Sequence, residues 1–155
     1  MTPQLSAQQK LNQLVKLLGE PGGFARLNIN QRKFLFGVIL AMIVPADSKV
    51  KECELEKLQN LLRGLNTQGH VLNDSMSMAH LKFNAVANVD TLARAMGELL
   101  GAQDRAGFVR HLWELALSDD ELHNAEERLI FRIADLSGVT RKHVAAELAK
   151  AAAKH

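Results

Sequence analysis

One short pattern occurs twice in this chain of 155 residues, and the two copies lie 72 residues apart. Each copy has an Asp, an aliphatic residue three positions later and a Glu seven positions after the Asp. The copies are Asp47, Val50 and Glu54, and Asp119, Leu122 and Glu126. Self-similarity at a constant spacing indicates a duplicated supersecondary unit, and two copies are too few for a solenoid. We therefore expect a pseudo-symmetric pair.

The repeat continues into the apolar residues on both sides of this pattern. The matching pairs are Phe36 and Phe108, Leu40 and Leu112, Ile43 and Leu115, Leu58 and Ile130, and Leu61 and Ile133. Steps of three and four residues are typical of one face of a helix, and each acid falls on the same stripe as the apolar residues. We therefore expect two helical hairpins that each direct two carboxylates inward.

A carboxylate that is buried without a partner is costly, so these acids need backbone N–H groups, a basic side chain or a cation. Candidate basic partners are Lys57, Arg110 and Arg128. Hard cations such as Ca²⁺ and Mg²⁺ bind through oxygen atoms. The candidate metal ligands are Asp47, Glu54, Asp119 and Glu126, with Asp120, Glu121 and His123 as further candidates. The spacing matches no EF-hand loop, and such acids also serve as helix and turn caps, so both roles stay open.

No segment shows a sustained two-residue alternation, so we predict an all-α, compact helical bundle of about seven helices. A capping box of Ser6 with Gln9 begins a helix over residues 6–18. Asn30 is expected to cap the central helix, Asp90 a helix over 91–100, and Thr140 the last helix. Residues 64–77 are expected to form a loop with a helical turn. The predicted single domain has a core over about 24–136, with helices 6–18 and 140–154 as additions.

Composition excludes several classes of protein. A net charge of +2 is too small for a dedicated nucleic-acid binder. Cys53 is the single cysteine, so neither an intramolecular disulfide nor a cysteine-based zinc site is available. The most apolar run, Phe34 to Ala46, has 13 residues, whereas a transmembrane helix needs roughly 20. The N-terminus also lacks a secretory signal, so we expect a cytoplasmic protein.

The pattern of an apolar helix, an Asp, an aliphatic residue and a Glu seven after the Asp resembles the bacterial tellurite-resistance TerB family. Both copies carry it, over Ala41 to Leu58 and Leu112 to Ile130. The resemblance implies a compact bundle of two pseudo-symmetric hairpins with acidic residues gathered in or near a groove. It also implies a stress-related role, since some members serve resistance to tellurite, phage or colicin, and most members have no established biochemical activity.

Two features depart from the family pattern. The glycine that usually follows the Asp is Ser48 in one copy and Asp120 in the other. Lys51 and His123 stand where the family often has a Ser or Thr helix cap. A shifted capping box of Asn124 with Glu127 is available to the second copy, which leaves the role of its Glu open.

The sequence therefore predicts a non-enzymatic cytoplasmic interaction or sensing domain that binds a divalent cation or a basic partner through the repeated acids. We expect an unidentified protein partner and no catalytic residue. One alternative is a metal-dependent hydrolase with a dinuclear acidic site, although none of the histidines forms the helical His-Glu-x-x-His pattern. Another is a membrane-surface adaptor that uses the basic C-terminal helix, whose apolar face is weak for insertion.

Overall fold

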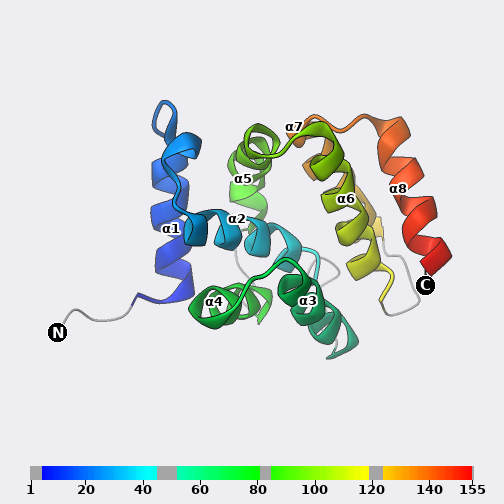
Figure 1. Ribbon diagram of the computed structural model, residues 1–155, viewed down its shortest axis with the longest axis horizontal. Helices are drawn as coiled ribbons and strands as arrows, with labels where there is room; N and C mark the ends of the chain where they lie inside the picture. The colour runs from blue at the N-terminus through cyan, green and yellow to red at the C-terminus, as the bar shows by residue number, and fades with distance from the viewer. Residues whose placement is uncertain (1–4, 45–51, 81–84, 119–123, 155) are drawn as a thin grey trace.

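The computed structural model describes residues 5–44, 52–80, 85–118 and 124–154. All regular structure in these ranges is helical, which confirms the predicted all-α class (Figure 1). The described ranges contain eight α-helices rather than about seven, together with the short 3-10 helix η1 (Gly23–Arg26). The α-helices are α1 (Ala7–Leu18), α2 (Ile29–Ala41), α3 (Glu52–Gly64), α4 (Gly69–His80), α5 (Ala85–Leu99), α6 (Ala102–Ala116), α7 (Asn124–Ser137) and α8 (Arg141–Lys154).

Two expected helix starts and the expected loop are wrong. Asn28, not Asn30, caps α2 and forms a capping box with Gln31. Helix α5 begins at Ala85, so Asp90 lies inside it and pairs with a residue of α7 instead of capping. The stretch expected as a loop is largely the helix α4, which packs extensively against α2. Packing on a neighbouring apolar helix supplies stability that the polar α4 sequence does not have alone.

Helix α2 is buried on nearly every side beyond its first turn. It contacts α3, α4, α5 and α6. Every residue from Gly37 to Val44 is buried. A helix that is apolar all round requires neighbours on all sides, so α2 forms the centre of the core. In Figure 1 it runs between α1 and α3, with α4 below it, while α1 and α8 lie at opposite ends of the long axis.

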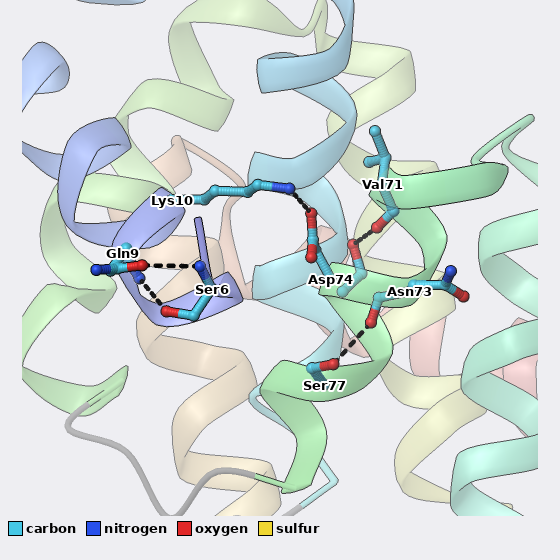
Figure 2. A network of polar contacts seen from close by, with 8 residues as sticks. Ser6, Gln9, Lys10, Val71, Asn73, Asp74 and Ser77 are labelled. Carbon is cyan, nitrogen blue, oxygen red and sulfur yellow. Dashed lines mark hydrogen bonds and ion pairs between the residues drawn. The ribbon is translucent and has the colours of Figure 1, made fainter. Parts of the chain in front are cut away.

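Helix α1 is joined to α4 by charge as well as by apolar packing. Lys10 Nζ lies 2.6 Å from a carboxylate oxygen of Asp74, as Figure 2 shows. The same view shows the predicted capping box, in which the Ser6 hydroxyl accepts from the Gln9 N–H at 3.2 Å. The buried residues Leu11 and Leu14 place the other face of α1 in the core.

The repeat is longer than the predicted hairpins, because it contains three helices. Helices α3 and α7 begin 72 residues apart, and so do α4 and α8. The first helix of each unit packs extensively on the third, α2 on α4 and α6 on α8. In the second unit this contact includes a buried hydrogen bond from Trp113 Nε1 to the carbonyl of Val144, 3.1 Å long. The two repeated units are therefore α2–α4 and α6–α8.

The second helix of each unit ends in the same way. Asn66 and Gly138, again 72 residues apart, have φ of 61° and 88°, in the left-handed region. The next residues, Thr67 and Val139, each donate an N–H to the carbonyl five positions earlier, at 2.9 and 2.8 Å. This is the Schellman arrangement, in which a left-handed residue lets the chain satisfy the last helical carbonyls. The duplication thus extends to individual backbone hydrogen bonds.

A basic side chain from the first helix of each unit holds this end in place. Lys33 Nζ donates to the carbonyl of Asn66 at 2.7 Å. Arg105, 72 residues later, donates to the carbonyls of Ser137 and Leu100 at 3.2 and 3.0 Å. Cations at helix C-termini are favourable because the helix dipole is negative there. Lys33 and Arg105 therefore stabilise equivalent helix ends in the two units.

The close approach of α5 to α7 gives a test of this packing. A Cβ at Gly97 would lie 2.6 Å from the carbonyl oxygen of Ser137, which is backbone and cannot rotate away. We expect Gly97→Ala to lower the free energy of unfolding by about 1–3 kcal/mol. Gly107→Ala is the control, since a Cβ there meets nothing within 4 Å, and it should raise stability by roughly 0.5–1 kcal/mol. Urea unfolding measures both, and equal effects would contradict the packing described.

Candidate functional site

The two repeated glutamates lie at equivalent places in the two units. Glu54 is in the first turn of α3 and Glu126 in the first turn of α7. Each is only 1% exposed, so the inward direction expected for them is confirmed. The positive end of the helix dipole favours an acid at these positions. The structure therefore presents two buried carboxylates, one in each unit, at the same helical register.

The other candidate ligands lie outside the described residues, namely Asp47, Asp119, Asp120, Glu121 and His123. Within the ranges that the structure describes, no three His, Cys, Asp or Glu side chains are grouped so that they could hold a metal ion. The role of the repeated acids as cation ligands therefore stays a prediction that depends on both described and undescribed residues.

Two of the basic residues proposed as partners of these acids surround a different carboxylate. Glu114 of α6 lies 3.8 Å from Arg110 Nε, 4.0 Å from Lys57 Nζ and 3.5 Å from His111 Nδ1. Its side chain is 13% exposed. Arg128 donates from Nε to the backbone carbonyl four residues earlier. Because Lys57 comes from α3, the Glu114 cluster joins the two repeated units electrostatically.

A groove of about 580 Å³ lies between the N-terminal half of α2 and α6. The rings of Phe36 and Phe108 line it with their centroids 5.8 Å apart and their planes tilted by 54°. These two residues occupy the same position in the repeat, so equivalent side chains of the two units meet in the groove. Ile29 at the start of α2 also lines the groove and is 67% exposed. The groove therefore has an apolar lining centred on the contact between these two rings.

Charged side chains of mainly one sign also line this groove. Arg32, Lys33, Arg110 and His111 are the basic ones, and Asp104 is the acidic one. Arg32 and Asp104 are equivalent positions of the repeat, so the two units differ in charge at the place where they meet. Arg32 is exposed and forms no ion pair with any acid in the described part of the chain.

The α2–α6 groove is not predicted by the sequence. A signal for half of it was present, because Ile29, Arg32, Lys33 and Phe36 follow the spacing of one helix face. Such a stripe of apolar and basic residues indicates an amphipathic face. It does not say which other helix lies opposite, so the groove itself had no signature in the sequence.

The Glu114 cluster predicts a measurable contribution to stability. We expect Glu114→Gln to lower the free energy of unfolding by about 1–3 kcal/mol, since three basic groups lose the negative charge that they share. Asp90→Asn is the matched control, because Asp90 and Arg132 are 44% and 49% exposed and such a pair contributes less than about 1 kcal/mol. Urea unfolding at low and at high salt compares them. Equal losses in the two variants would show that the Glu114 cluster is only a surface contact.

No helix in the described ranges is long and apolar enough to cross a membrane. No curated protein and no solved structure matches the chain. The family model described as tellurite resistance protein TerB matches residues 36–149, which include helices α3 to α7 whole, the C-terminal part of α2 from Phe36 and most of α8. Since this match covers well over half of the 155 residues, the chain belongs to the TerB family.

Proposed function

We propose that this protein is a non-enzymatic interaction and sensing domain of the cytoplasmic stress response, whose repeated acidic elements bind a divalent cation, Ca²⁺ or Mg²⁺. The observation that carries the proposal is the burial of Glu54 and Glu126 at matching positions of the two units. Each has an Asp seven residues before it, at Asp47 and Asp119. The cation would be shared by, or bound separately to, these Asp and Glu pairs.

The chemistry of the acids supports a hard cation over a soft one. Carboxylates are the oxygen ligands that Ca²⁺ and Mg²⁺ use, and Mg²⁺ commonly completes its shell with water. Cation binding to the folded state alone would also couple cation concentration to the stability of the domain. A sensing domain requires a coupling of this kind, because a protein partner can then distinguish the loaded from the unloaded form.

Two observations favour this role over the alternatives. A dinuclear hydrolase generally combines carboxylates with His ligands around metals roughly 4 Å apart, and the repeated elements supply carboxylates without a His motif. A membrane-surface adaptor would need the apolar face of α8, but Val144 and Ala151 are buried and α8 packs extensively on α6. That face is already occupied in the bundle.

Calorimetric titration of chelator-treated protein with Ca²⁺, Mg²⁺, Mn²⁺ and Zn²⁺ tests the proposal. We expect saturable binding of Ca²⁺ or Mg²⁺ to the natural protein, and none to the amide variant with Asp47→Asn, Glu54→Gln, Asp119→Asn and Glu126→Gln. Cation at 100 times its Kd should stabilise the natural protein by about 2.7 kcal/mol, which a rise in Tm would report.

A control variant separates specific ligation from loss of charge. It changes four exposed acids to amides, Glu20, Glu56, Glu98 and Asp135, and it should bind cation as the natural protein does. The single variants Glu54→Gln and Glu126→Gln then show whether one unit or both units bind. Absence of binding by the natural protein, with the amide variant merely less stable, would assign the acids to helix capping and ion pairs.

A further inference from the structure

We infer that the groove between α2 and α6 is a binding site for small organic anions that combine an apolar body with one acidic group. This inference does not depend on the cation proposal, because the groove residues and the repeated acids are different. It rests on the size of the groove, its apolar lining and the sign of the charges around it.

Size and lining are those of a small-molecule site. Ligand pockets commonly measure about 300–1,000 Å³ and combine an apolar surface with a few polar groups, and this groove measures about 580 Å³. The tilted rings of Phe36 and Phe108 give it an aromatic centre. Leu65 from just beyond α3 and Leu100 from just before α6 add aliphatic surface. A flat or branched hydrocarbon body would bury against these four side chains.

The charges select an anion. Lys33 is already engaged with the carbonyl of Asn66, and Arg110 lies close to the carboxylate of Glu114. Arg32 is exposed on the same helix face as Phe36 and has no acidic partner in the described residues. Its guanidinium can therefore donate to a carboxylate or sulfonate whose body rests on the rings, an arrangement that favours a planar bidentate contact.

Asp104, the acidic residue of the lining, should affect affinity in the opposite direction from Arg32. Asp104 occupies the position in α6 that Arg32 occupies in α2, and its carboxylate repels an anion in the groove. An anionic ligand should therefore bind more weakly when Arg32 is removed and more tightly when Asp104 is neutralised. A purely apolar ligand would respond to neither change, and a cationic ligand would respond with the opposite signs.

Fluorescence titration with 8-anilinonaphthalene-1-sulfonate, an aromatic anion, measures binding to the folded protein in the presence of chelator. Chelator keeps the result independent of any cation site. We expect Arg32→Ala to raise the Kd roughly fivefold, as for loss of about 1 kcal/mol in a charge contact. Asp104→Asn should lower the Kd by a few fold. The control Arg63→Ala, at an exposed position of α3 that does not line the groove, should leave it unchanged.

Competition identifies the ligand class, and NMR locates the site. Octanoate should displace the dye. Inorganic phosphate and octanol at the same concentration should not, because phosphate has no apolar body and octanol has no negative charge. Shifts should appear in the methyl signals of Ile29, Leu65 and Leu100. Circular dichroism and urea unfolding confirm that each variant folds.

Three outcomes would overturn the inference. One is an equal effect of Arg32→Ala and Arg63→Ala, which would make binding a non-specific response to charge. Another is displacement of the dye by phosphate as effectively as by octanoate, which would show that the groove binds anions without any requirement for an apolar body. The third is binding of an acidic peptide at these methyl groups without binding of the dye or octanoate, which would assign the groove to a protein partner.

Discussion

The arrangement of this protein depends on one helix that is apolar on almost all sides. From Gly37 to Val44 the chain is continuously buried, so it has no face to offer to water. Helices α3, α4, α5 and α6 enclose it. The polar sequence of α4 is helical for this reason, because the gain from covering α2 outweighs its weak local preference. The N-terminal half of α2 is less enclosed, since Arg32 is exposed and Phe36 is only partly buried, and the α2–α6 groove lies along it.

Duplication explains why the groove is where it is. Two copies of a three-helix unit meet so that equivalent residues, Phe36 and Phe108, lie side by side with their ring centroids 5.8 Å apart. The copies have kept their structural features, including the left-handed cap residues Asn66 and Gly138. They differ in charge beside these rings, where Arg32 corresponds to Asp104. A symmetric scaffold thereby carries an asymmetric surface, which is a requirement for orienting a ligand that has an acidic end.

The buried and partly buried glutamates occupy two different environments. Glu54 and Glu126 lie buried in the first turns of helices, where the backbone itself favours a carboxylate. Glu114 lies instead between units, where basic side chains from α3 and α6 approach it. Glu54 and Glu126 are equivalent positions of the repeat, whereas Glu114 has no acidic counterpart in the first unit. The repeated acids therefore belong to each unit separately, whereas Glu114 joins the two units.

The sequence by itself determined the helical class, the duplication, the capping box at Ser6 and the burial of Glu54 and Glu126. These follow from local spacing, because helical periodicity fixes which face of a helix each residue occupies. Only the tertiary structure decided that residues 69–80 are helical, that Lys57 and Arg110 lie against Glu114, and that Phe36 and Phe108 line a groove. Each of these depends on which helices become neighbours. The residue spacing along one helix shows which face is apolar, but it does not show which other helix packs against that face.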